Sequence, residues 1–219
     1  MSEINLMDCY PRSKRPLDDR ARLVTDEHRR IAKRFEKEYF DGDRLTGYGG
    51  YNYHPRFWQD TVRRFRDHYQ LKPDASVLDV GCAKGFMLHD FKELMPDLTI
   101  AGVDVSQYAL DHAMPDVRPY MQLASAAKLP FADKSFDLVL AINTVHNLPR
   151  GDCMQALREM RRVSKKSMFL VVDAWRNEQE RQNLMTWILT AQCCMHVDDW
   201  KVLFQQCGYD GDYTWFILE

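Results

Sequence analysis

The sequence predicts an α/β protein: a doubly wound, mostly parallel sheet with helices on both faces, preceded by an N-terminal helical extension. From residue 75 onward, short apolar runs such as DLVLAI and SMFLVV alternate with segments of helical periodicity. Buried strands that alternate with helices are typical of βαβ units. The 219 residues, 45% of them hydrophobic, suffice for one full core.

The first 72 residues are expected to form an arm, helices and a lid loop packed on that core. Residues 1–24 are polar and contain prolines, which favours an extended arm. Thr25 suits an N-cap, and the helix that it opens is expected to end at 41–43. Pro55 suits the start of a second helix, which closes at 72–73.

Residues 73–219 are expected to form the core as one structural unit. Its expected strands are 76–80, 99–104, 120–123, 137–143, 168–173 and 213–218. Its expected helices are 86–95, 107–113, 152–163, 178–194 and 198–207. Right-handed crossovers place every strand-to-helix loop at one edge of such a sheet, and ligands bind at that edge.

The turn VLDVGCAKGF after the first core strand is the strongest local motif. A dinucleotide fingerprint needs G-x-G-x-x-G, but Phe86 stands at the third glycine position, which weakens that interpretation. No GxxxxGK[ST] phosphate loop is present. What remains is acid-x-G-x-(G/A)-x-G. A second acid, Asp104, ends the next strand within IAGVDVS, twenty-five residues after Asp79.

These motifs, with the stretch AKLPFADKSFDLVLAINTVHNLP, resemble the class I S-adenosylmethionine-dependent methyltransferases over about residues 75–173. The resemblance implies a Rossmann-like methyltransferase sheet, S-adenosyl-L-methionine as cofactor and S-adenosyl-L-homocysteine as product. It implies that Asp104 holds the ribose hydroxyls and that Ser125 and Ala126 contact adenine. The implied cofactor-binding residues are Asp79, Gly81, Cys82, Ala83, Gly85, Asp104, Val105, Ser125, Ala126 and Asn143.

The sequence departs from the family pattern in three places. Ala83 replaces the usual middle glycine, a change expected to be sterically mild. Ser125 stands where many members carry an acid, so the adenine contact has no charge. The family commonly ends in an antiparallel strand pair, of which only 213–218 is visible in the sequence.

Methyl transfer from a sulfonium is an in-line displacement, so the protein mainly supplies positioning and exclusion of water. His146, after the fourth strand, is a candidate general base or a residue that only orients its loop. Asp173 is the second catalytic candidate, at the end of the fifth strand. Arg176 is a candidate clamp for an anionic acceptor. For Asp173 and Arg176 the alternative is a local ion pair or cap.

The loop 47–58, GYGGYNYHPRFW, is a candidate lid, because glycines permit movement and tyrosines bring flat area with a polar tip. Its proposed substrate-side residues are Tyr48, Tyr51, Tyr53 and His54. Alternatively, the tyrosines only pack the N-terminal helices on the sheet. The stretch 178–194 is either the other wall of the site or ordinary core.

Composition limits the other functions. The net charge is −2 and no basic stripe stands out after the sheet begins, which disfavours nucleic acid. The six cysteines form no CxxC pair, and no metal site is predicted. Without an apolar run of membrane length or a signal segment, a cytoplasmic protein is expected, with no membrane partner.

The expected function is therefore methylation of a small polar molecule: a sugar, an amino-acid derivative or a secondary-metabolite precursor. The alternative is a non-catalytic regulatory or partner protein that binds the cofactor or its demethylated product. The acceptor atom and the oligomeric state are left open.

Overall fold

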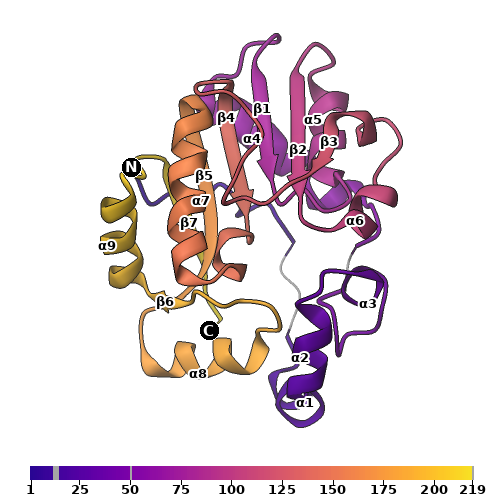
Figure 1. Ribbon diagram of the computed structural model, residues 1–219, viewed down its shortest axis with the longest axis vertical. Helices are drawn as coiled ribbons and strands as arrows, with labels where there is room; N and C mark the ends of the chain where they lie inside the picture. Colours follow the sequence, from indigo (N-terminus) through magenta and orange to yellow (C-terminus); the bar gives the residue numbers. More distant parts are fainter. Residues whose placement is uncertain (12–14, 50, 219) are drawn as a thin grey trace.

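A computed structural model describes residues 1–11, 15–49 and 51–218. It confirms the predicted class: the main path of the sheet runs β3-β2-β1-β4-β5-β6, and β7 pairs with β5 (Figure 1). The strands are β1 (Ser76–Val80), β2 (Thr99–Asp104), β3 (Met121–Leu123), β4 (Phe136–Ile142), β5 (Ser164–Trp175), β6 (Met195–His196) and β7 (Asp212–Phe216).

Helices precede and connect these strands. The N-terminal helices are α1 (Leu17–Leu23), α2 (Asp26–Ala32), α3 (Lys37–Phe40), the 3₁₀ turn η1 (Pro55–Phe57) and α4 (Gln59–Tyr69). The connecting helices are α5 (Phe86–Leu94), α6 (Gln107–Asp111), η2 (Arg118–Tyr120), η3 (Val145–Asn147), α7 (Arg150–Val163), α8 (Glu178–Trp187) and α9 (Val197–Cys207). None of those in the described residues is long and apolar enough to cross a membrane.

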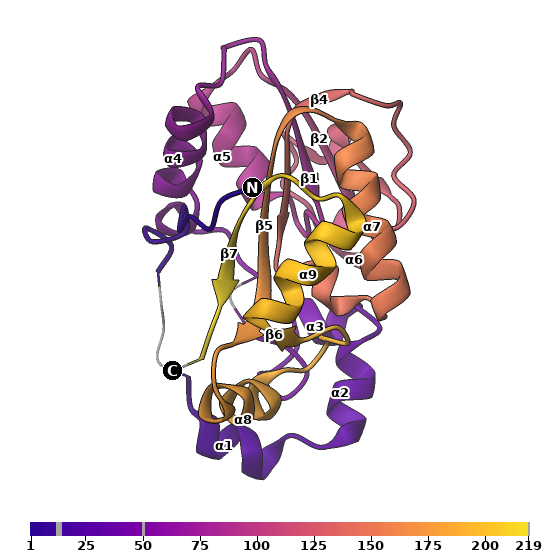
Figure 2. The ribbon, with the colours of Figure 1, turned by 90° about the vertical axis from the view of Figure 1, so that its left-hand side faces the viewer.

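Two apolar layers sandwich the sheet, as the continuous hydrophobic strands predict. On one face, Phe65 of α4 and Phe91 of α5 pack against Leu138 and Leu140 of β4. The other face carries α7 and α9, whose buried residues include Trp200. Figure 2 shows α4 and α5 on one side of the sheet and α7 and α9 on the other. The carboxyl ends of the strands face α1, α2, α3 and α8 (Figure 1).

The end of the sheet differs from the family pattern. Both β6 and β7 run parallel to β5, so the described residues contain no antiparallel strand pair there. The N-terminal segment adds to the far edge of β7: Tyr213 donates its N–H to the carbonyl of Ser2, and its own carbonyl accepts from Ile4. Residues 1–24 are therefore not simply an extended arm, since part of them pairs with the sheet and part forms α1.

Two predicted helices are shorter than expected. The helix opened by Thr25 breaks because Phe35 adopts φ 54°, and α3 starts afresh after it. The second, α8, ends at Trp187 rather than at residue 194. After Trp187 the backbone forms hydrogen bonds with other segments and not within a helix. Tyr48 accepts from the N–H of Leu189, and the His146 carbonyl accepts from the N–H groups of residues 192 and 193.

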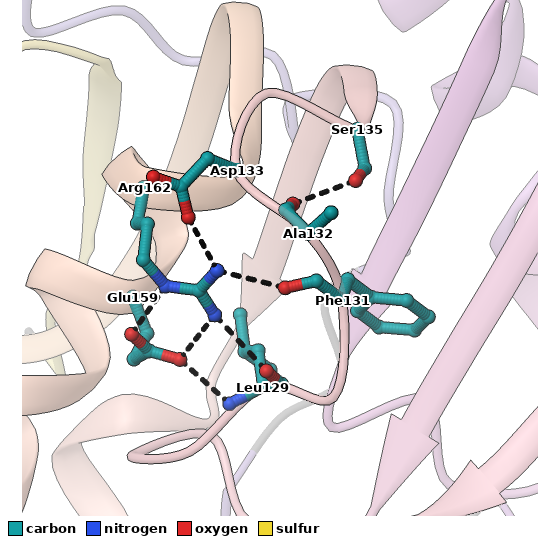
Figure 3. A network of polar contacts seen from close by, with 7 residues as sticks. All are labelled: Leu129, Phe131, Ala132, Asp133, Ser135, Glu159 and Arg162. Carbon is teal, nitrogen blue, oxygen red and sulfur yellow. Dashed lines mark hydrogen bonds and ion pairs between the residues drawn. The ribbon is translucent and has the colours of Figure 1, made fainter.

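Arg162 of α7 fixes the segment that leads into β4 (Figure 3). Its guanidinium binds both carboxylate oxygens of Glu159 and donates to Asp133 and to the carbonyls of Leu129 and Phe131. Glu159 in turn accepts from the Leu129 N–H at 2.8 Å. Charge-assisted, bidentate contacts of this kind are the strong ones, so the segment after Ala126 is held at a defined position.

A basic hollow of about 590 Å³ lies beside this network, at the amino-terminal edge of β4 and β5. Its lining includes Lys134, Arg158, Arg161, Lys165 and Lys166. Sequence analysis missed this concentration of charge, which the fold assembles from a turn, the end of α7 and the start of β5. Several of the cations are already paired with acids. The hollow is at the opposite end of the strands from the candidate site.

Candidate functional site

The turn between β1 and α5 requires two of its glycines. Gly81 has φ 82°, and a Cβ there would lie 2.2 Å from Oγ1 of Thr144. Gly85 has φ 76° and forms the N-terminal cap of α5. An L side chain would be strained at either position. The backbone can therefore turn sharply and present its N–H groups at the carboxyl edge of the sheet.

Ala83 occupies the middle position with φ 49°, a left-handed conformation that costs a non-glycine residue about 1 kcal/mol. The substitution is therefore less mild than the sequence suggests. Part of the cost is offset because the Ala83 N–H donates to Oδ2 of Asp104 at 2.8 Å. The glycine turn and the end of β2 are thus joined directly.

Asp104 is the best-defined residue of the site. Its Oδ1 accepts from the N–H of Ser106 at 2.9 Å, while Oδ2 accepts from Ala83. Ser106 itself caps α6 by accepting from the N–H of Ala109, so Asp104 is not needed as the cap. The carboxylate is buried, and burial raises its pKa. Each carboxylate oxygen can accept more than one hydrogen bond, so Asp104 is oriented by the backbone and still fits a vicinal diol.

Asp79 and Cys82 lie beneath the turn. Asp79 is buried, and burial together with the nearby Asp104 carboxylate raises the pKa of Asp79 to about 8. Cys82 is also buried, and its Sγ would lie 2.8 Å from a Cβ added at Gly102. Cys82 therefore packs between the turn and β2, and burial raises its pKa well above the usual range, which keeps the thiol protonated.

The implied adenine residues have mixed surroundings. Val105 is 51% exposed, unusual for a valine next to a buried acid. Ser125 is exposed and its hydroxyl accepts from the Ala127 N–H, whereas Ala126 is buried. Asn143 takes φ 53° directly after β4. An exposed apolar side chain next to Asp104 is consistent with a flat ring binding there.

His146 and Asp173 form a buried pair at the ends of β4 and β5. Nδ1 of His146 accepts from the backbone N–H of Asp173, and its Nε2 lies 3.5 Å from Asp173 Oδ2. Burial lowers the pKa of His146 and raises that of Asp173, although each partner opposes the other's shift. The Nδ1 lone pair is already used. This geometry favours a histidine that orients its loop over a free base.

The first half of the predicted lid covers the sheet edge. Tyr48 stacks on Trp187 and accepts a hydrogen bond from Leu189 at 2.8 Å. Tyr51 packs against Tyr39, and its carbonyl accepts from Nζ of Lys84 in the glycine turn. Sequence analysis did not select Tyr39, which is buried. Gly50 of the loop lies outside the described residues.

Three other candidates lie elsewhere or are engaged locally. Tyr53 donates to Asp90 of α5 at 2.7 Å, and exposed His54 caps η1, so neither joins Tyr48 and Tyr51. Arg176 forms a two-pronged ion pair with Glu180, the local alternative considered for it. Among the described residues, no group of three or more His, Cys, Asp or Glu side chains is placed to hold a metal ion.

Comparison with known proteins finds similarity to methyltransferases. Residues 77–167 match the family model of a methyltransferase domain. The demethylmenaquinone methyltransferase of Lysinibacillus sphaericus is 30% identical over 142 residues, which are 63% of this chain and 58% of that protein. The chain thus spans less than two thirds of this relative.

Solved structures share the fold. The YcgJ protein of Bacillus subtilis has a TM-score of 0.55 at 20% identity, covering 67% of this chain and 66% of that one. The [4+2]-cyclase SpnF has a TM-score of 0.53 at 21% identity, covering 69% and 58%. The name of the second protein indicates that this fold also hosts other chemistry.

Proposed function

We propose that the chain is a class I S-adenosylmethionine-dependent methyltransferase, because residues 77–167 match a methyltransferase domain, and that it transfers the methyl group of S-adenosyl-L-methionine to a small polar acceptor. The observation that carries this proposal is the direct link between the glycine turn and Asp104. The turn brings backbone N–H groups to the strand ends, and the buried carboxylate stands beside it, fixed by Ala83 and Ser106.

The chain's own residues would divide the task as follows. Gly81 and Gly85 let the backbone approach the methionine portion closely, and Asp104 accepts from the two ribose hydroxyls. The bound cofactor supplies a methyl group already activated on a sulfonium. Tyr48 and Tyr51 exclude water from the strand ends, which favours an in-line displacement between positioned groups.

His146 and Asp173 act in this proposal as positioning residues. Their pairing fixes η3 to β5, and the His146 carbonyl fixes residues 192 and 193. The ends of β4 and β5 thereby form the wall of the proposed acceptor site opposite Tyr48. An acceptor that carries its own ionised nucleophile needs no further base from the protein.

The proposed methyl acceptor is a small molecule: a sugar, an amino-acid derivative or a secondary-metabolite precursor. The support for this proposal is the aromatic cover that Tyr48 and Tyr51 form with Trp187 and Tyr39. We also propose residues 73–219 as the cofactor-binding core with residues 1–72 as its cover, a cytoplasmic location, and no nucleic-acid or membrane partner.

The test begins with cofactor binding. Two charge-assisted hydrogen bonds to the ribose contribute at least ~3 kcal/mol, which corresponds to about 150-fold in affinity. Asp104→Ala is therefore expected to weaken S-adenosylhomocysteine binding about a hundredfold or more in calorimetry. Asp111→Ala, an exposed acid on α6, is the matched control. Unchanged affinity in Asp104→Ala would remove the ribose assignment.

Transfer is then measured with methyl-labelled cofactor and a metabolite extract. Label in a small-molecule product supports the proposed function. Tight cofactor binding with no transfer across broad extracts would contradict it, and would favour the non-catalytic alternative or a different reaction on the same fold.

A further inference from the structure

Arg20 of α1 is a buried cation. Its side chain is 6% exposed, yet none of the described acidic residues pairs with it. Its Nη1 donates to the carbonyl of Arg44, while its Nε is buried and has no hydrogen-bond partner among the described residues. Buried charges are ordinarily paired, and a buried donor left unsatisfied is costly. The arrangement therefore calls for an explanation.

Arg29 and Arg44 increase the free-energy cost of burying the charge of Arg20. Burial lowers its pKa most, Tyr48 opposes this shift, and the positive charges of Arg29 and Arg44 lower the pKa further. Two further cations are thus close to one desolvated guanidinium. A negatively charged group bound there would remove both the unsatisfied donor and the mutual repulsion.

Two aromatic rings fix the guanidinium. It lies 4.4 Å from the ring centroid of Trp187 and 5.5 Å from that of Tyr48. Cation–π contacts of this kind hold the plane of the group but do not use its N–H donors. With Nη1 engaged, the edge formed by Nε and Nη2 makes no hydrogen bond to the described residues. That edge is a two-donor fork, which matches two oxygens of a carboxylate or phosphate.

The position of Arg20 connects it to the candidate site. Tyr48, which shares the contact, bonds to Leu189, and burial together with the Asp173 charge raises the pKa of Tyr48 to about 12. Tyr48 therefore contacts Arg20 and is near enough to Asp173, at the carboxyl end of β5, to be affected by its charge. Arg15 also reaches this region: it lies over the rings of Trp187 and Phe216, and its charge lowers the pKa of Asp173.

We propose that Arg20 binds an oxyanion group, a carboxylate or a phosphate, of the methyl acceptor. This rests on the proposed function and narrows it to anionic acceptors. It also assigns the recognition of that charge to Arg20 in the N-terminal cover, whereas sequence analysis assigned it to Arg176.

A purely structural role for Arg20 and a ligand-binding role predict different stabilities for a variant that lacks the guanidinium. If the ring contacts of Arg20 serve only to fasten α1 to α8 and the lid, replacing it must destabilise the chain. If the guanidinium is kept for a ligand, an apolar side chain of similar shape removes an unpaired buried charge, and the ligand-free protein is unchanged or more stable. Arg20→Met and Arg22→Met form the matched pair, since Arg22 is on the same helix but exposed and paired with Asp19.

The first experiment measures thermal unfolding of both variants in sodium phosphate, in sodium acetate and in sodium chloride at equal ionic strength. We expect phosphate or acetate to raise the midpoint of the wild type and of Arg22→Met above the chloride value. In Arg20→Met that increment is expected to vanish, while the unfolding midpoint in chloride is expected to equal or exceed that of the wild type. A lower midpoint in chloride, or an oxyanion increment that persists in Arg20→Met or is absent from the wild type, would overturn the proposal.

The second experiment uses the labelled product. An anionic product is retained on an anion exchanger, and phosphatase treatment releases it only if the charge is a phosphate, which separates the two sources. With the acceptor in hand, Arg20→Met is expected to raise its KM about ten- to a hundredfold with little change in kcat, because a charge-assisted contact is lost. Arg20→Lys keeps the charge but lacks the two-donor edge. Its KM is expected to lie between those of the wild type and Arg20→Met.

Failures of the two proposals are distinguishable. A neutral labelled product that releases no acid on alkaline hydrolysis, and so is not a methyl ester of a carboxylate, overturns the assignment of Arg20 and leaves methyl transfer standing. Cofactor binding without transfer contradicts the proposed function, and the oxyanion-dependent unfolding of Arg20→Met still decides whether the guanidinium is an anion site.

Discussion

Asp79→Asn provides a stringent test of the electrostatics beneath the glycine turn. Asp79 is buried at the end of β1, and burial together with Asp104 raises its pKa to about 8. At neutral pH the folded chain therefore holds a proton on Asp79. Asparagine keeps the size of the side chain but has no proton to lose.

The direction in which the free energy of unfolding changes with pH follows from proton linkage. An unfolded aspartate ionises near pH ~3.9, so between about pH 4 and pH 8 the folded state binds more protons than the unfolded state. The free energy of unfolding due to Asp79 then falls as pH rises, by at most about 1.4 kcal/mol per pH unit. From pH 5 to pH 8 the wild type is expected to lose up to about 4 kcal/mol relative to Asp79→Asn.

The assay is urea unfolding without cofactor at several pH values across that interval. The lowered pKa of His146 acts in the opposite direction, since the unfolded histidine binds the extra proton. Both proteins share that effect, so their difference isolates Asp79. Asp111→Asn, at an exposed position, serves as control. Parallel stability curves for the wild type and Asp79→Asn would refute a protonated carboxyl at neutral pH.

The remaining predictions concern the turn and the buried pair. Gly81→Ala places a Cβ against Thr144 at a positive φ and is expected to cost more than about 2 kcal/mol in the free energy of unfolding. Gly151→Ala, where an added Cβ meets no described atom within 4 Å, is expected to stabilise slightly; equal effects in urea unfolding would contradict the steric argument. His146→Ala leaves the N–H of Asp173 without its partner and is expected to cost about 1–3 kcal/mol in the same measurement. An unchanged unfolding midpoint would show that the pair does not hold η3 in place.

The core of the fold was predictable because its signals are local. The bounds of β1 and β2 agree with the apolar runs that predicted them, and α5 differs by one residue at its end. Alternating buried strands and helices specify parallel pairing almost without reference to distant residues. The acid-and-glycine pattern likewise placed Asp79 and Asp104 at adjacent strand ends.

What could not be predicted depends on contacts between distant segments. The break at Phe35 and the end of α8 at Trp187 occur where other parts of the chain hold the backbone, against a helical pattern that continues. Within one loop, Tyr48 turns to α8 and Tyr53 to α5, a division that tyrosine content does not reveal. The lack of an acidic partner for Arg20 among the described residues is visible only when burial and pairing are both known.

The distance in sequence between the two halves of the cover has a consequence for biosynthesis. Tyr48 and Leu189, which join it, are 141 residues apart. The glycine turn and Asp104, the parts of the proposed cofactor site, leave the ribosome before Leu189 does. The cover over that proposed site is therefore completed only after α8 has been made.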